Sequence, residues 1–319
     1  MNKQSSLYQE LNHAELLSIM ASVFPQEKVT DYHLLSGGLF NTTYRVITDQ
    51  RDVVLRMGPV HRELLLPYER DLMTAEALTN QLCRENGIPA SVVLHLDTSK
   101  AVIDRDFMIV DYIDSIPLSD PSIPEECRKD ILLECGKLAR RLHAITGNQF
   151  GRLSNIVTGK GCSSWCEAVF AEFDDILSQA QEYQVFDSSL CHRVYAFLEE
   201  RNVLLDTVNV PHLAHADLWA GNILVRKTAG NYQVCAIIDG DRALFGDENF
   251  DLATPWMITP EFLAGYGFVT DSADLDNAEK RKVYTLLLAL HDAYVWKIEY
   301  GRPDIAEENI RTAENILNS

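Results

Sequence analysis

The chain has 319 residues, 46% apolar and 24% charged, which is an ordinary globular composition with enough length for a sizeable core. The formal net charge of −19 disfavours nucleic acid and anionic membranes as partners and would attract a cationic small molecule, although solubility alone also explains it. The seven cysteines include no Cys-x-x-Cys pair, and the N-terminus has no basic head before an apolar run. We therefore expect a cytoplasmic protein with reduced thiols.

The first 115 residues predict a small sheet with one inserted helix. The predicted elements are helices over 12–23 and 68–87, three strands within 32–59, and one strand each over 91–97 and 107–114. Gly37–Gly38 supplies a turn between the first strands, and Gly87 with Pro89 stops the second helix. We assign residues 1–115 to an N-terminal nucleotide-binding lobe.

From residue 125 onward the pattern is mainly helical. Helices are predicted over 125–145, 163–182, 188–206 and most of the chain after 250. Between them, two apolar runs flank a turn at Gly230–Asn231 and predict a β-hairpin. Residues 116–319 are therefore assigned to a helical C-terminal lobe that contains a catalytic loop and a substrate site, and the fold class is α+β.

Polar side chains stand at the ends of the predicted hairpin. Asn222 opens its first strand and Asp239 closes its second, so antiparallel pairing brings them to the same end. Carboxylate and amide oxygens suit Mg²⁺, and Asp217 could orient an acceptor hydroxyl. These are the groups that phosphoryl transfer from a nucleotide requires, together with a cation on the donor phosphates.

The spacing His215-x-Asp217-x-x-x-x-Asn222, followed by Asp239 after an apolar run, resembles the Brenner-type signature of the protein-kinase-like fold. More narrowly, the chain is similar to the aminoglycoside phosphotransferase and choline kinase family of small-molecule kinases, and "GDENFDLA" at 246–253 resembles a later segment of that family. The resemblance implies a bilobal protein-kinase-like fold, with a small antiparallel-sheet N-lobe and a larger helical C-lobe. It also implies ATP or GTP and Mg²⁺ between the lobes.

The same resemblance implies a set of nucleotide-binding residues. Arg56 would be the cation on the donor phosphates and Glu76 its partner, with Glu69 as the rival partner. Asn222 and Asp239 would bind the metal, Asp217 would be catalytic, and His215 belongs to the catalytic motif with a structural role. The remaining cofactor-binding residues are expected in the phosphate-covering loop and in the connector: Ser36, Gly37, Gly38, Asn41, Thr42, Asp111, Tyr112 and Ile113.

Some features depart from protein kinases. Arg56 replaces the usual Lys, Gly240–Asp241 replaces Phe-Gly, and Trp219 stands where Lys is usual. No Ala-Pro-Glu follows, so protein-kinase activity is disfavoured. Asp251 is expected to accept hydrogen bonds that hold a loop, and not to react.

The acceptor is predicted from the resemblance as a hydroxyl of a cationic sugar such as an aminoglycoside. Acidic residues of the helical lobe could bind its amines, namely Asp174, Asp175 and Glu261, although such residues are also typical of solvated helix faces. Fructosamine-type kinases share the Leu-Trp and Gly-Asn of this loop, but usually have Pro after the metal-binding Asp. The same motifs are compatible with a choline or amino-alcohol kinase, and with a catalytically silent pseudokinase that only binds nucleotide.

Overall fold

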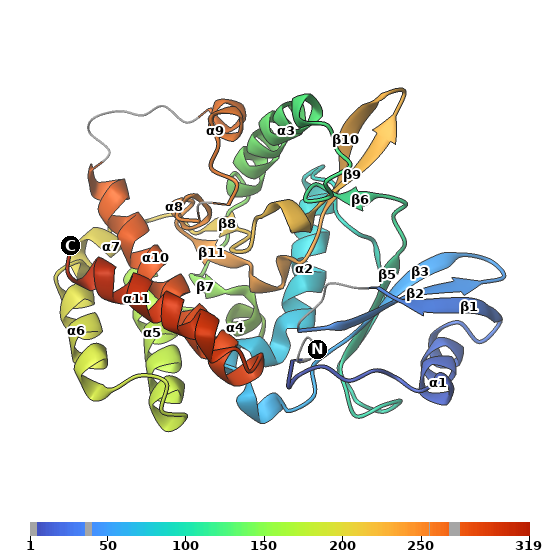
Figure 1. The fold of residues 1–319 in the computed structure, drawn as a ribbon, viewed down its shortest axis with the longest axis horizontal. Coiled ribbons are helices and arrows are strands. Elements are labelled where there is room, and N and C mark those ends of the chain that lie inside the picture. The colour runs from blue at the N-terminus through green and yellow to red at the C-terminus, as the bar shows by residue number, and fades with distance from the viewer. Residues whose placement is uncertain (1–4, 36–39, 255, 268–274) are drawn as a thin grey trace.

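The computed structural model describes residues 5–35, 40–254, 256–267 and 275–319. A five-stranded antiparallel sheet forms the small lobe (Figure 1). Its strands occur in the order β1-β2-β3-β5-β4 and are β1 (Val29–Leu34), β2 (Thr42–Thr48), β3 (Asp52–Met57), β4 (Val93–Asp97) and β5 (Phe107–Asp111). All five strands were predicted from the sequence.

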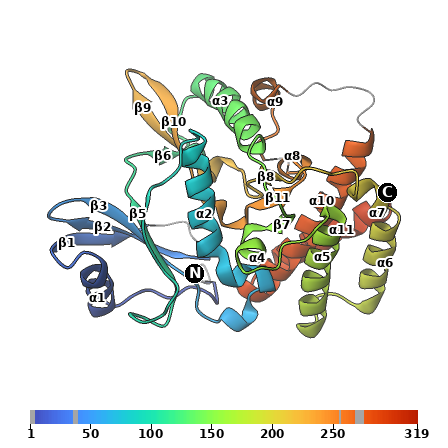
Figure 2. The ribbon, with the colours of Figure 1, turned by 180° about the vertical axis from the view of Figure 1, so that it is seen from behind.

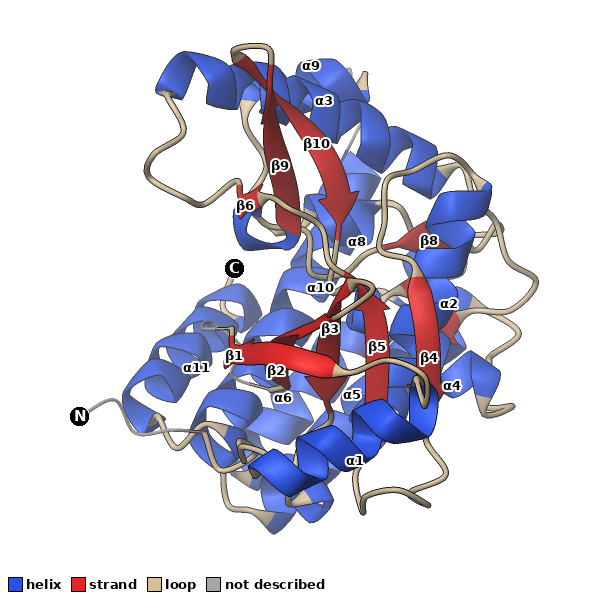
Figure 3. Ribbon diagram, turned by 90° about the vertical axis from the view of Figure 1, so that its right-hand side faces the viewer, coloured by secondary structure: helices blue, strands red, loops and turns tan. Residues whose placement is uncertain are grey.

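Each face of this sheet packs against a helix. On one face, alternating side chains of β2 and β3 pack on α1 (His13–Val23), which begins at the N-cap residue Asn12 and contributes Leu16 and Ile19 (Figure 3). On the other face, Met108 of β5 packs against Met73 of α2 (Leu72–Glu85). Strand alternation alone predicts such a two-sided sheet.

The helix α2 lies between the sheet and the rest of the molecule (Figure 2). It follows two short 3₁₀ turns, Arg62–Leu64 and Pro67–Asp71. Its buried face includes the polar residues Glu76, Thr79 and Asn80. Buried polar residues at helical spacing indicate that this face does more than fill a core.

Helices make up most of the larger lobe. They are α3 (Glu125–His143), α4 (Leu153–Val157), α5 (Trp165–Glu182), α6 (Ser188–Glu199), α7 (Asn202–Leu205), α8 (Asn249–Leu252), α9 (Pro260–Tyr266), α10 (Leu275–Tyr294), which continues into a π-helical turn over Val295–Glu299, and α11 (Pro303–Leu317). The predicted helix over 188–206 is therefore two helices. Among the described residues, no helix combines the length and apolar character needed to cross a membrane.

The predicted hairpin is present as β9 (Ile223–Thr228) and β10 (Asn231–Ile237), and β6 (Ile116–Pro117) adds to the edge of β9. A second small sheet was not predicted, because its strands are only two or three residues long: β7 (Gly151–Arg152), β11 (Leu244–Gly246) and β8 (His212–Ala214), in that order. The small antiparallel lobe and the larger helical lobe confirm the predicted α+β fold class. The lobe boundary near residue 115 stays a prediction.

Candidate active site

The candidate catalytic loop runs from β8 to β9 and carries Asp217 and Asn222. The Asn222 Nδ2 donates to the Asp217 carboxylate Oδ2 at 3.0 Å and to the Asp217 backbone oxygen at 2.9 Å. Burial raises the pKa of Asp217, although the positive charge of Arg242 acts in the opposite direction. The loop therefore holds one carboxylate in a defined orientation, as a group that positions an acceptor hydroxyl must be held.

Asp251 of α8 fixes the beginning of this loop. Its two carboxylate oxygens accept hydrogen bonds from the backbone N–H groups of His215 at 2.9 Å and Ala216 at 2.7 Å. The Nε2 of His143 lies 3.0 Å from one of these oxygens. Burial would raise the pKa of Asp251, but the hydrogen bond with His143 keeps it below its ordinary value. The carboxylate thus stabilises a strained turn, since Ala216 has a φ of 63°, in agreement with the structural role expected of Asp251.

His215 connects the loop to the hairpin. Its side chain is buried, and its Nε2 lies 3.1 Å from the backbone oxygen of Ile238, to which it donates. The Nδ1 is also buried and has no hydrogen-bond partner among the described residues. These contacts make His215 a residue that positions the loop, and they support the structural role expected for it.

The two predicted metal ligands are brought to the same end of the hairpin. Ile223 pairs with Ile237, and the backbone N–H of Ile238 donates to the backbone oxygen of Asn222 at 2.9 Å. Asp239 follows with φ 63° and ψ 40°, a left-handed conformation that costs a non-glycine residue roughly 1–3 kcal/mol. The surrounding structure maintains this strain at the residue predicted to bind the metal.

Arg56 joins the two lobes electrostatically. Its Nη1 lies 3.0 Å from Glu76 Oε1 on α2, and its Nη2 lies 2.5 Å from Asp239 Oδ1. Burial raises the pKa of Glu76 to about 7, although Arg56 opposes the shift. Burial would raise the pKa of Asp239, but Arg56, together with His215 and Arg242, lowers it below its ordinary value. The cation predicted from the third strand therefore contacts its expected partner Glu76 and, in addition, the predicted metal ligand Asp239.

The structure also decides between the two rival partners of Arg56. Glu69 lies in the 3₁₀ turn before α2, where its Oε2 accepts from the backbone N–H of Leu66 at 3.0 Å and its Oε1 lies 3.4 Å from His291 Nε2. Glu76, in contrast, forms the ion pair with Arg56.

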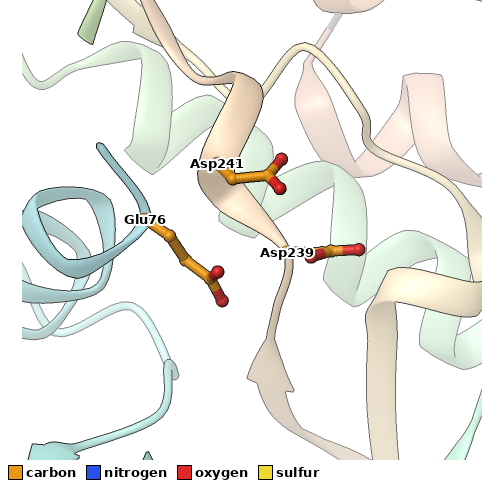
Figure 4. A group of neighbouring side chains, drawn as sticks. All are labelled: Glu76, Asp239 and Asp241. Carbon is orange, nitrogen blue, oxygen red and sulfur yellow. The ribbon is translucent and has the colours of Figure 1, made fainter. Parts of the chain in front are cut away.

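Three carboxylates lie close together (Figure 4), and Arg56 forms ion pairs with two of them. Oxygen atoms of Glu76, Asp239 and Asp241 all lie within 4.8 Å of one another, and Glu76 Oε2 is buried without a hydrogen-bond partner in the described part of the chain. Burial, Asp239 and Glu76 together raise the pKa of Asp241 well above its ordinary value. Three carboxylates beside a single positive charge, that of Arg56, are a suitable set of oxygen ligands for a divalent cation such as Mg²⁺. Asn222, at the same end of the hairpin, could add its side-chain amide oxygen.

Sequence reasoning missed Asp241 and Arg242 as site residues. Asp241 stands out in the sequence only as a departure from the protein-kinase pattern, and Arg242 lies beyond the signature. The positive charge of Arg242 acts to lower the pKa of both Asp217 and Asp239. Both residues lie in the three-residue turn Gly240–Arg242, which directly follows Asp239. Their closeness in sequence to a predicted metal ligand was therefore the one feature that could have identified them.

The predicted phosphate-covering loop is described only in part. Ser36, Gly37 and Gly38 lie outside the described residues. Asn41 is buried, and its amide oxygen has no hydrogen-bond partner within the described ranges. Thr42 is fully buried and its hydroxyl donates to the Gln9 backbone oxygen at 3.0 Å, so this hydroxyl has a structural contact. The contact of Asn41 and Thr42 with a nucleotide stays a prediction.

The three connector residues lie at the end of β5 and directly after it. Asp111 ends β5, and its Oδ1 accepts from the Val92 backbone N–H at 2.5 Å. The Arg45 guanidinium stacks 3.8 Å from the centre of the Tyr112 ring, and the Ile113 oxygen accepts from the Ser115 hydroxyl at 2.9 Å. The side chains of Asp111 and Tyr112 therefore have structural contacts, and their contact with a nucleotide stays a prediction.

The acidic residues predicted to bind the acceptor do not form one group. Asp174 and Asp175 lie on α5 and Glu261 on α9, and these helices are far apart in the helical lobe in all three views (Figures 1–3). Asp174 Oδ1 accepts from the Tyr195 hydroxyl at 2.6 Å. Helix packing therefore separates Glu261 from the pair on α5, and the contact of each residue with an acceptor stays a prediction.

The fold and the arrangement of Arg56, Asp217, Asn222 and Asp239 are those of a phosphotransferase with a protein-kinase-like fold. A model of the Phosphotransferase enzyme family matches residues 31–279. The chain belongs to this family, which confirms the predicted resemblance and the predicted enzyme class.

Solved structures support the same fold. A thermostable mutant of aminoglycoside phosphotransferase APH(4)-Ia, in a ternary complex with AMP-PNP and hygromycin B, superposes with a TM-score of 0.67 at 19% identity. The alignment covers 94% of this chain and 97% of that one. At this identity the likeness establishes the fold alone.

Two curated proteins are similar over shorter stretches. Acyl-CoA dehydrogenase family member 10 of Mus musculus is 23% identical over 228 residues, which is 68% of this chain and 19% of that protein. Hygromycin-B 4-O-kinase of Escherichia coli is 30% identical over 106 residues, which is 32% of this chain and 30% of that protein. The matched part of the chain thus spans less than a third of either relative's length.

Proposed function

We propose that this chain transfers the γ-phosphoryl group of ATP or GTP to a hydroxyl of a small molecule. The observation that carries the proposal is the joint geometry of one hydrogen-bonded pair and one ion-paired group of three residues. Asn222 orients the Asp217 carboxylate at 3.0 Å, and Arg56 bridges Glu76 of α2 and Asp239 of the hairpin. In a phosphoryl transferase these groups would position the acceptor and the donor phosphates, respectively.

Each residue has a separate role in this mechanism. Asp217 accepts the hydrogen bond of the acceptor hydroxyl and aligns its oxygen with the γ-phosphorus, and its raised pKa suits a group that takes up a proton late in the transfer. Arg56 binds donor phosphate oxygens, and Glu76 holds its guanidinium in place. Mg²⁺, when bound by Asp239 and Asn222, would neutralise charge on the phosphates.

The lobes divide these tasks. Residues 1–115 would bind the nucleotide, with the segment 36–42 and the connector residues 111–113 around it. Residues 116–319 would supply the catalytic loop and the acceptor site.

For the acceptor, a cationic sugar of the aminoglycoside type is the best-supported class. The net charge of −19 favours a cation, and the related Escherichia coli protein is a hygromycin-B 4-O-kinase. Exposed carboxylates bind cations weakly one at a time, roughly 0–1 kcal/mol each, so we expect their joint effect to weaken as salt rises. The acceptor KM should therefore increase with NaCl more than the nucleotide KM.

A nucleotide-consumption screen tests the proposal. It should contain aminoglycosides, a ketosamine, choline and a macrolide, with ATP and GTP each supplied with Mg²⁺. We expect turnover with an aminoglycoside, and a loss of about 10²- to 10⁴-fold in Asp217→Asn with nucleotide binding retained. Nucleotide binding without turnover on any acceptor would favour a pseudokinase, and turnover only with uncharged acceptors would refute the cationic substrate.

A further inference from the structure

A groove lies along α2, and its lining does not include Arg56, Glu76 or Asp239. It is formed by α2, β4 and α4, which are neighbours in Figure 3, and has a volume of about 570 Å³. Its walls are mainly apolar and include Leu78, Val93, Leu96 and Val157. A volume in the range of about 300–1,000 Å³ with mostly apolar walls is typical of small-molecule sites.

Two polar side chains are buried in the wall of this groove. Asn80 and Ser91 both line it and are only 3% and 7% exposed. Neither side chain forms a hydrogen bond with any residue in the described part of the chain. Their polar atoms are accessible from the groove, so a ligand that supplies both a donor and an acceptor can form hydrogen bonds with them.

The charges at the rim of the groove balance each other. Arg84 donates to the Ala90 backbone oxygen at 3.3 Å, and the Glu85 carboxylate accepts from the Gln81 amide at 2.8 Å. One cation and one anion give the groove no preference for a charged ligand. The Asn80 amide, which both donates and accepts, is complementary to another amide.

The groove is connected to the candidate active site through α2. One helical turn before Asn80, Glu76 holds Arg56, and the neighbouring Thr79 hydroxyl donates to the backbone oxygen of Gly240 at 2.8 Å. Gly240 lies between Asp239 and Asp241, so α2 contacts both the phosphate-binding cation and the turn that carries the carboxylates. A ligand that fixes α2 against β4 and α4 would stabilise these contacts.

We propose that the groove between α2, β4 and α4 is an effector site for a small, neutral, apolar molecule that carries an amide group, and that its occupation strengthens nucleotide binding. The second part rests on the proposed function. Because coupling between two sites is reciprocal, nucleotide must strengthen binding of the effector by the same factor.

The test uses 2-naphthamide as the probe, with titration calorimetry on the full chain. Asn80→Leu removes the amide at nearly constant size, and Leu96→Trp fills the groove. Leu94→Trp is the matched control, since Leu94 is an exposed leucine of the same strand that does not line the groove. We expect both groove variants to bind the probe at least tenfold more weakly than the parent and the control. Saturating probe should lower the Kd of AMP-PNP with Mg²⁺ about fivefold, the low end of typical coupling.

Several results would overturn the proposal. Equal probe affinity in the parent, Asn80→Leu and Leu96→Trp would show that the groove is not the site, and so would a dimeric parent that becomes monomeric in Leu96→Trp. Specific probe binding with an unchanged nucleotide Kd would refute the effector role. A parent that binds the probe specifically but binds no nucleotide would support the site and refute the proposed function. Thermal unfolding of each variant checks that the fold is intact.

Discussion

Replacing Glu76 by Gln should separate nucleotide binding from stability. The change keeps the size of the side chain but removes the charge 3.0 Å from Arg56. Attraction at that distance is roughly 5 kcal/mol at an effective dielectric constant near 20, and much of it is offset by desolvation. A net loss of roughly 1.5–3 kcal/mol remains for a hydrogen bond between charged groups. We expect the Kd of nucleotide with Mg²⁺ to rise about 10- to 100-fold, because Arg56 is then held by Asp239 alone.

The stability of the unliganded protein should change in the opposite direction to its nucleotide affinity: at alkaline pH the variant should be more stable than the parent. Burial raises the pKa of Glu76 to about 7, against about 4.3 in an unfolded chain. The folded state therefore keeps a proton that the unfolded state has lost, and stability falls as the pH rises through this window. The total loss is roughly 3.7 kcal/mol, of which roughly 1.4 kcal/mol falls between pH 6 and pH 9. Gln cannot ionise, so the variant should not show this loss.

Urea unfolding at pH 6 and pH 9, without Mg²⁺ or nucleotide, measures the stability effect, and calorimetry with AMP-PNP and Mg²⁺ measures the affinity. The control is Glu85→Gln, an exposed residue of the same helix, which should match the parent in both assays. If Glu76→Gln binds nucleotide as tightly as the parent, Arg56 does not depend on Glu76. If the free energy of unfolding of the variant has the same pH dependence as that of the parent, Glu76 is not the titrating group.

Three further variants test other parts of the structure. Asp239→Ala should abolish Mg²⁺-dependent nucleotide binding, because a hard oxygen ligand leaves the site; equilibrium binding with and without Mg²⁺ measures this, and unchanged affinity would make Asp239 only a residue at a strand end. Asp251→Asn should cost roughly 1–3 kcal/mol of stability in urea unfolding and lower kcat, since the new amide hydrogens face the backbone N–H groups of the catalytic loop; an unaltered protein would exclude the anchoring role. Burial and Glu69 raise the pKa of Glu299 well above its ordinary value, so Glu299→Gln should be tolerated at neutral pH and should be more stable than the parent in alkaline urea unfolding; a large loss of stability would show that Glu299 is ionised in the fold.

The sequence by itself determined the local elements and the residues grouped by short spacing. Alternation of apolar residues identified β2 and β3, and helical spacing identified α2. Asp217 and Asn222 are five residues apart in one loop, so their contact needs no information from the rest of the fold. The hairpin likewise placed Asn222 and Asp239 at one end, because antiparallel pairing across a short turn leaves little freedom of register.

Only the tertiary structure decided which distant residues meet. Glu69 and Glu76 are seven residues apart, which would place both on one face of a continuous helix. The chain instead forms a 3₁₀ turn over Pro67–Asp71 before α2 begins at Leu72, so Glu69 contacts His291 while Glu76 contacts Arg56. The separation of α5 from α9 and the groove beside α2 are equally invisible in the sequence. They depend on how helices dock across the two lobes, and the periodicity of a helix specifies which face is buried but not its partner.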